Sequence, residues 1–179
     1  MPPASRGWSG PEVAAGAPLV AAVFAWLHLL AAGIAAALLM AEYWLCRRMP
    51  DRIQVRLLGI VDLGYFLALI TALATGLAKL LHDGQAPTYY YANRLFWLKI
   101  AVFLAIGLLA ILPSLQYLRW NREARAAPAF APLTREVERV RAAIALELGL
   151  WLVMPLLAVL VARGYGLPAA HPWAAAGLP

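Results

Sequence analysis

The chain has 179 residues, of which 64% are hydrophobic and only 13% are charged, and its mean hydropathy is +0.73. A soluble domain carries roughly a quarter charged residues, so this composition excludes a soluble globular protein and indicates one integral membrane domain. The net charge of +6 does not indicate a nucleic-acid-binding protein, because the arginines gather at the ends of apolar stretches. Cys46 is the only cysteine, which excludes a disulfide within the chain and a thiolate metal cluster.

The chain opens with a polar lead-in, residues 1–17, which does not have the pattern of a signal peptide. An α-helix rises about 1.5 Å per residue, so about 20 apolar residues cross the hydrocarbon core of a bilayer. Residues 18–163 therefore predict an all-α membrane domain, an antiparallel bundle of four helices. The four apolar stretches cover residues 18–45, 57–81, 95–118 and 142–163. Residues 164–179 are rich in proline and predict a flexible tail.

The basic residues predict how the bundle is oriented. Ten of the 15 lysines and arginines lie in the two loops that follow the first and third stretches, and five lie on the other side. Cytoplasmic loops carry the excess of lysine and arginine, so we expect both loops in the cytoplasm and both termini outside. The expected location is the inner membrane of a bacterium. Small residues four apart, Gly33 with Ala37 and Ala72 with Gly76, predict close packing of helices within the chain.

His28 lies about ten residues inside the first stretch, on the order of 15 Å from its outer end. Neutral imidazole binds haem iron or another metal through one ring nitrogen. The alternative is a structural histidine that bonds to a helix carbonyl group. No second histidine stands at a matching depth in another stretch, which argues against a bis-histidine haem clamp. Met154 has a similar depth, although methionine is more often a packing residue.

Lys79, Trp97 and Lys99 share the outer half with His28. A lysine near a helix end usually extends its stem to the interface. The alternative is that Lys79 and Lys99 hold an anionic group, such as a porphyrin propionate or a lipid head group. The common depth makes His28, Lys79, Trp97 and Lys99 the predicted cofactor site, with His28 as the predicted metal ligand. No catalytic residue is assigned.

Three acidic residues, Glu42, Asp62 and Glu147, form a second polar group near the inner ends of the stretches. One interpretation is a structural belt of ion pairs, because arginine stabilises carboxylates at the edge of a membrane. The other interpretation is a proton relay or a site for a cationic ligand between the helices. The arginines near this group are Arg47, Arg48, Arg56 and Arg141.

The chain has no nucleotide-binding glycine loop, no HExxH, no GxSxG and no cysteine pair. The arginine-rich segment 119–141 carries no aromatic platform interleaved with its charges, so we expect it on the anionic inner leaflet and not on nucleic acid. The expected partners are the lipid bilayer and other membrane-protein subunits.

One set of motifs resembles an uncharacterised group of bacterial four-helix membrane proteins, domain of unknown function 2214. The resemblance covers about residues 22–162 and implies a four-helix integral membrane protein without a settled activity. Its most specific stretch runs from Thr75 to Lys99. The motifs are Asp62, Thr75-Gly76-Leu77, Tyr90, Asn93, Phe96-Trp97-x-Lys99, Pro113 and Arg119-Trp120.

A looser similarity links the chain to the HemJ family of four-helix protoporphyrinogen oxidases, which bind haem b. In that family a histidine follows an aliphatic pair early in the first span, as in Trp26-Leu27-His28, and a lysine opens the third span, as Lys99 does. The resemblance implies haem b as the cofactor, His28 as its ligand and Lys99 in the porphyrin pocket. The flanking sequence differs, so oxidase activity is implied less directly than binding.

Three functions follow from these features. The first is a haem- or porphyrin-binding membrane protein with a redox role and a site at His28 and Lys99. The second is a non-catalytic accessory subunit of a larger membrane complex. The third is a small transporter that uses Glu42, Asp62 and Glu147, although the two halves show no repeat of the kind typical of transporters.

Overall fold

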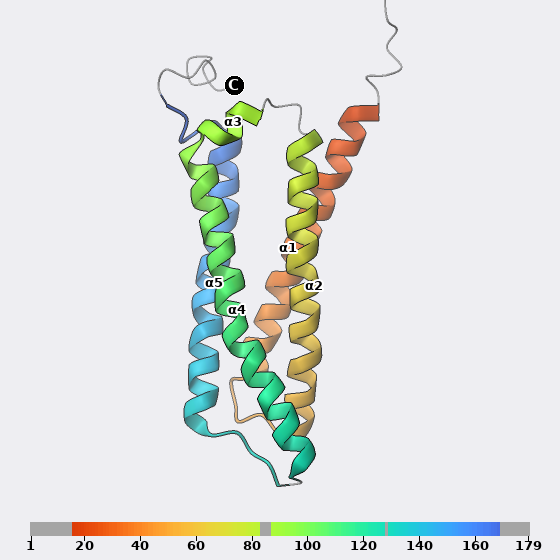
Figure 1. The fold of residues 1–179 in the computed structure, drawn as a ribbon, viewed down its shortest axis with the longest axis vertical. Helices are drawn as coiled ribbons and strands as arrows, with labels where there is room; N and C mark the ends of the chain where they lie inside the picture. The colour runs from red at the N-terminus through yellow and green to blue at the C-terminus, as the bar shows by residue number, and fades with distance from the viewer. Residues whose placement is uncertain (1–15, 83–86, 128, 169–179) are drawn as a thin grey trace, which may run out of the picture.

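The computed structural model describes residues 16–82, 87–127 and 129–168. Within these ranges the chain is helical and has no strand (Figure 1). The helices are α1 (Gly16–Leu45), α2 (Arg52–His82), α3 (Pro87–Ala92), α4 (Arg94–Ala126) and α5 (Thr134–Ala162). The polar lead-in up to residue 15 and the tail from residue 169 lie outside the described residues.

Helices α1, α2, α4 and α5 are each long and apolar enough to cross a membrane. The expectation of an all-α membrane bundle is confirmed. The helices extend beyond the apolar stretches, because α4 continues to Ala126 and α5 already begins at Thr134. Hydropathy marks only the part of a helix that meets lipid, whereas backbone hydrogen bonding continues into polar residues. The short helix α3 lies in the loop between α2 and α4, at the end of the bundle that is named outer after the predicted orientation, and no apolar stretch predicts it.

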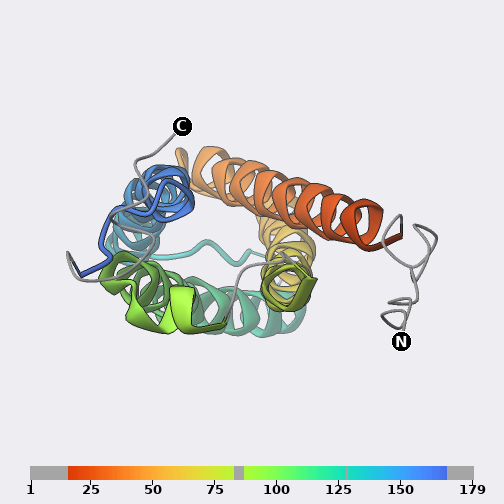
Figure 2. The ribbon, with the colours of Figure 1, turned by 90° about the horizontal axis from the view of Figure 1, so that it is seen from above.

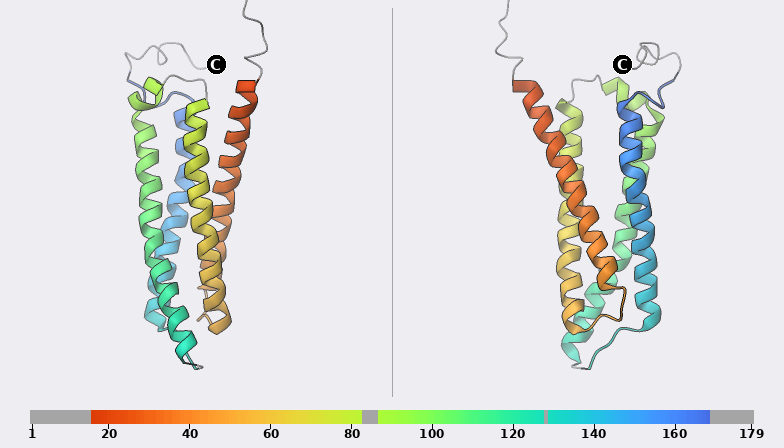
Figure 3. Two further views of the ribbon diagram at one scale, coloured as in Figure 1. Left: turned by 45° about the vertical axis from the view of Figure 1, so that its right-hand side comes forward. Right: turned by 180° about the vertical axis from the view of Figure 1, so that it is seen from behind.

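The four long helices run alternately up and down around a common axis (Figures 1 and 2). Helix α1 packs along α2 and α4 packs along α5, while α2 also contacts α4 and α1 also contacts α5. The N-terminal half of α1 leans away from α5, as both views in Figure 3 show. The bundle is therefore two helical hairpins whose contact is closer toward the inner end.

The burial of side chains also differs between the two ends of the bundle. No described side chain in residues 19–30 of α1, 76–82 of α2 or 94–105 of α4 is buried. The largest fully buried side chains, Tyr65, Tyr117 and Trp120, belong to the inner half. Lipid is as apolar as leucine, so helices in a membrane associate through close packing and hydrogen bonds. The inner half provides both, and the outer half is packed more loosely.

Polar contacts hold the inner ends of the helices together. The indole of Trp120 donates to Glu136 Oε2 at 2.9 Å, and Arg119 forms an ion pair with the same carboxylate. Asn121 Nδ2 donates to the carbonyl of Val55 at 3.1 Å, which ties α4 to the start of α2. These contacts explain why α4 and α5 stay helical beyond their apolar stretches.

The outer end of the second hairpin is fixed by a buried cap. Asn93 accepts from the backbone of Leu95 at 2.9 Å and so caps α4. Gly166 has a φ of +90°, and a Cβ there would lie 2.6 Å from Asn93 Oδ1. The segment after α5 therefore packs against the start of α4. Tyr89 of α3 donates to the carbonyl of Val161 at 2.6 Å, which completes this closure.

Ala35 and Ala37 of α1 offer a matched test of the hairpin contact, because Ala35 is fully buried and Ala37 is exposed. We expect Ala35→Leu to lower the free energy of unfolding by about 1–3 kcal/mol, since added methylenes force packed helices apart. Ala37→Leu leaves it nearly unchanged. Thermal unfolding of both variants in mild detergent measures the difference. Equal stabilities would contradict the packing of α1 described here.

Candidate functional site

His28 lies on the side of α1 that faces α2. Its Nδ1 is 2.7 Å from the carbonyl oxygen of Ala72, and its side chain is half-buried. Gly76, one turn further along α2, leaves room for the ring, because a Cβ there would lie 3.0 Å from His28 Cε1. The Ala72 and Gly76 pair therefore packs within the chain, as predicted.

The contact with Ala72 fixes which nitrogen of the neutral ring carries the proton. A carbonyl oxygen only accepts, so Nδ1 must donate, and the lone pair of neutral imidazole then resides on Nε2. Histidines that bind metals commonly use this arrangement, in which one N–H donates to a carbonyl and the other nitrogen is the ligand. His28 has the geometry of a ligand as well as that of a structural histidine.

Two of the other three predicted cofactor residues lie near His28. Both Lys79 and Lys99 act on its imidazole electrostatically, and Lys99 also feels the charge of Lys79. Trp97 has different neighbours: its indole donates to the carbonyl of Tyr91 at 3.1 Å, and its side chain is 51% exposed. The structure thus gathers His28, Lys79 and Lys99, while Trp97 packs with the aromatic residues of the outer interface.

The other side chains considered as ligands are held elsewhere. Met154 is partly buried and packs against the core. Nδ1 of His82 lies 2.8 Å from the carbonyl of Ala78, and its ring packs against Phe24 at 5.2 Å between centroids. No group of three or more His, Cys, Asp or Glu side chains within residues 16–82, 87–127 and 129–168 has the arrangement of a metal site.

The three acidic residues of the inner half come from α1, α2 and α5, and each has a hydroxyl partner on another helix. Tyr117 donates to Glu42 at 3.2 Å, Tyr65 donates to Glu147 at 3.0 Å, and Ser114 Oγ lies 2.6 Å from Asp62 Oδ1. Glu42 and Glu147 are 1% and 0% exposed. These contacts bring together three residues that the sequence grouped by depth alone.

The predicted belt of ion pairs is wrong for the residues that the structure describes. None of Glu42, Asp62 and Glu147 has a salt bridge there, and the described salt bridges join Arg119 to Glu123 and Glu136. Similar depth does not ensure contact, because most of these arginines are exposed at the surface, whereas Glu42 and Glu147 are fully buried. The carboxyl groups meet phenol and alcohol groups in place of guanidinium.

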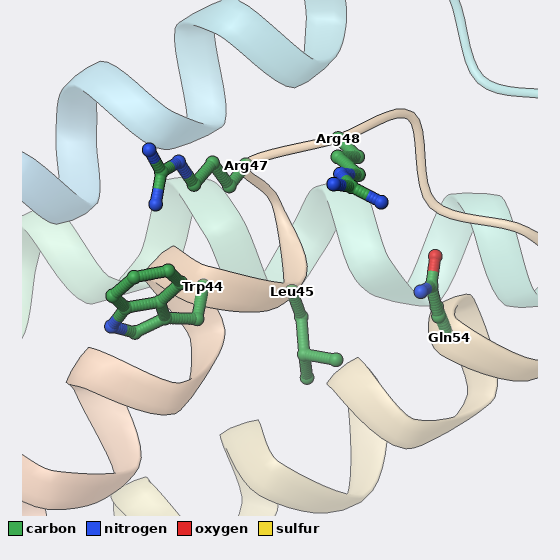
Figure 4. Close-up of a pocket in the computed structure, with 5 residues that line it drawn as sticks. All are labelled: Trp44, Leu45, Arg47, Arg48 and Gln54. Atoms are coloured by element: carbon green, nitrogen blue, oxygen red, sulfur yellow. The ribbon is translucent and has the colours of Figure 1, made fainter.

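The arginines after α1 lie at the surface, where they line a hollow of about 640 Å³. Figure 4 shows Arg47 above the indole of Trp44, and the guanidinium carbon is 4.8 Å from the ring centroid. Arg48 lies between Arg47 and Gln54 along the same hollow. These arginine side chains lie at the surface of the bundle, and the buried carboxyl groups have their partners on the helices.

Tyr65, Ser114, Tyr117 and Trp151 are the site residues that sequence reasoning missed. They are ordinary core residues by composition, since tyrosine and tryptophan are common in membrane helices. A signal was present: a buried tyrosine or serine in lipid needs a partner, and these residues stand at the depth of the acidic group.

The Gly33 and Ala37 pair was expected to pack within the chain, and that prediction is wrong. A Cβ added at Gly33 meets nothing within 4 Å, and Ala37 is exposed. Both residues lie on the side of α1 that is turned away from the bundle, because α2 meets the side that carries Ala31 and Ala35. The spacing of small residues identifies a smooth helix face but not the direction in which it points.

Gly76 and Gly33 give a matched pair of substitutions. Alanine stabilises a helix by up to about 1 kcal/mol relative to glycine, and we expect Gly33→Ala to show that gain. In Gly76→Ala the imidazole of His28 must shift by a few tenths of an ångström, which weakens a hydrogen bond that contributes about 0.5–1.5 kcal/mol. Gly76→Ala should therefore be about 1 kcal/mol less stable than Gly33→Ala. Unfolding in detergent measures both, and equal gains would contradict the close contact.

The comparisons with known proteins agree with the membrane architecture. Residues 20–166 match the family described as predicted membrane protein (DUF2214). No curated protein and no solved structure matches the chain. The match spans all four long helices, and the chain belongs to this family of membrane proteins.

Proposed function

We propose that the chain is a membrane protein that binds haem b or a related porphyrin in the outer half of the bundle, with His28 as an axial ligand. The observation that carries the proposal is the hydrogen bond from His28 Nδ1 to the carbonyl of Ala72, at 2.7 Å. It orients the ring and leaves the lone pair of Nε2 for a metal.

The surroundings of His28 suit an anionic macrocycle in two ways. The outer parts of α1, α2 and α4 contain no buried described side chain, so a flat ligand displaces little packed core. Lys99 lies within electrostatic range of His28 and Lys79, and its ammonium group would attract the carboxylate groups of a propionate. The similarity to the HemJ family rests on His28 and Lys99, the same two positions.

Each residue of the proposed site has a physical task. A bound haem supplies one-electron redox chemistry. Ala72 fixes the tautomer of His28, Gly76 gives the ring its space, and the two lysines attract the acidic edge of the ligand.

A visible absorption spectrum of protein purified in mild detergent tests the proposal. We expect a Soret band and, after reduction with dithionite, the α and β bands of a b-type haem. His28→Ala should remove the bands, because one axial nitrogen is lost. His82→Ala is the matched control, since His82 also bonds a backbone carbonyl but lies at the end of α2. It should leave the spectrum unchanged.

Two results would overturn this function. A folded wild-type protein that has no Soret band after incubation with haemin and removal of the unbound haemin has no such site. Bands that persist in His28→Ala show that His28 is not the ligand. A colourless protein that co-purifies with another membrane protein would favour an accessory subunit.

We also propose that the protein lies in the inner membrane of a bacterium, with the 46–51 and 127–133 loops in the cytoplasm and α3 on the outer side. The support is the arginine asymmetry, since Arg47, Arg48, Arg119, Arg122 and Arg125 all stand at one end of the bundle. Phospholipid head groups of the inner leaflet are the expected neighbours of these arginines.

Labelling with a membrane-impermeant maleimide measures this orientation. Cys46 is fully buried, so the wild-type protein is the unlabelled control. We expect Tyr91→Cys, at an exposed site of α3, to react in intact cells. Ala127→Cys, at the exposed end of α4, should react only after lysis. The reverse pattern would show that the bundle is inserted the other way.

A further inference from the structure

The acidic group of the inner half has a charge that the described structure does not balance. Asp62 and Glu147 are both close enough to Glu42 to repel its negative charge, and Asp62 acts on Glu147 in the same way. None of the three forms a salt bridge with a described residue. Three neighbouring carboxylates in an apolar medium are strongly unfavourable unless something neutralises them.

The contacts of Ser114 bear on the charge of Asp62. Ser114 Oγ lies 2.6 Å from Asp62 Oδ1 and 2.8 Å from the carbonyl oxygen of Ala110. A serine hydroxyl has one hydrogen, so it can only share that hydrogen between two acceptors. Both contacts become full hydrogen bonds when Asp62 carries a proton and donates it to Ser114 Oγ, while Ser114 donates to Ala110. This arrangement favours a protonated Asp62.

Glu147 stands at the end of a hydrogen-bond chain with a fixed direction. The indole of Trp151 only donates, and it lies 3.2 Å from the hydroxyl of Tyr65. Tyr65 in turn donates to Glu147 Oε2 at 3.0 Å. Glu147 Oε1 is buried and has no hydrogen-bond partner among the described residues. That oxygen is free to hold a hydrogen.

Glu42 resembles Glu147 in its contacts, which lie between α1 and α4. Tyr117 donates to Glu42 Oε2, and its hydroxyl also lies 3.8 Å from Cys46 Sγ. Glu42 Oε1 is the second buried carboxyl oxygen without a partner in the described part of the chain. Arg141 of α5 acts on the thiol of Cys46, so the nearest positive charge lies toward the inner end of the group.

These observations favour a proton over a metal ion as the neutralising species. The three carboxyl groups do not form a set of metal ligands in the described structure. Each already uses one oxygen on a hydroxyl group of a neighbouring helix, and the buried carboxyl oxygens without a partner among the described residues are Glu42 Oε1 and Glu147 Oε1. A proton needs one oxygen, whereas a sodium ion needs several converging ones.

We propose that Glu42, Asp62 and Glu147 form a proton-binding site in the inner half of the bundle. Each uptake step converts a carboxylate and a hydronium ion into a carboxylic acid and water, with no redox change. Tyr65, Tyr117 and Ser114 orient the carboxyl groups. Glu42 stands one turn before the end of α1 and is the member of the site nearest to the inner ends of the helices, while Asp62 and Glu147 hold protons deeper in the bundle.

Infrared spectroscopy of the purified protein near neutral pH, in sodium-free buffer, tests the site directly. We expect C=O stretching bands of protonated carboxylic acid that move to lower frequency in D2O. Asp62→Asn, Glu42→Gln and Glu147→Gln should each reduce this absorption. Glu138→Gln is the matched control, because Glu138 is an exposed acid of α5 and its removal leaves the bands unchanged.

Tyr65→Phe separates a proton on Glu147 from a purely structural effect. This variant keeps the carboxyl group but removes its hydrogen-bond donor, so a band of Glu147 should move to higher frequency without losing area. Retention on a sizing column shows that each variant is folded. The proposal can be tested even if a variant does not fold, because the spectrum of the wild-type protein alone can refute it.

Three results would overturn the proposal. The first is a wild-type protein without protonated carboxyl bands near neutral pH. The second is a set of bands that all three amide variants leave intact. The third is loss of the bands when sodium chloride is added at constant pH, which would show a cation site.

Discussion

The fold depends on one constraint, which is that lipid offers no hydrogen bonds to a polar group. A polar side chain turned into the bundle is therefore stabilised when it finds its partner within the protein, often on a neighbouring helix. Tyr65 with Glu147, Tyr117 with Glu42 and His28 with the carbonyl of Ala72 meet this requirement. Each of these bonds joins helices from distant parts of the sequence. They fix how the helices are rotated against one another, which apolar packing alone specifies weakly.

The constraint is met differently in the two halves. In the inner half, bulky aromatic residues fill the axis and their hydroxyl and indole groups bind the acidic side chains. In the outer half, α1 leans away from α5 and the polar residues are His28, Lys79 and Lys99. A well-packed polar core suits proton binding, and a looser region with cationic groups suits a large anionic ligand. The two proposed sites therefore occupy different parts of one bundle and do not compete for residues.

The two hairpins determine how the residues grouped by depth lie in the structure. His28, Lys79 and Lys99 were grouped by depth, and both lysines lie within electrostatic range of the His28 ring. The grouping of Glu42, Asp62 and Glu147 also holds, but their predicted arginine partners are wrong. Depth along a helix follows from residue number, whereas contact also needs the direction in which each side chain points. A helix turns by about 100° per residue, so that direction changes with every position.

The sequence by itself determined that this is a four-helix membrane protein, because the length and apolarity of a span are local properties of the chain. It also determined the depth of each polar residue. Only the tertiary structure decided that Ala72 accepts a hydrogen bond from His28, that Ser114 contacts Asp62 and that Gly33 faces away from the bundle. These facts depend on the rotation and tilt of helices against each other. Many side chains set that rotation and tilt together, and no single segment encodes them.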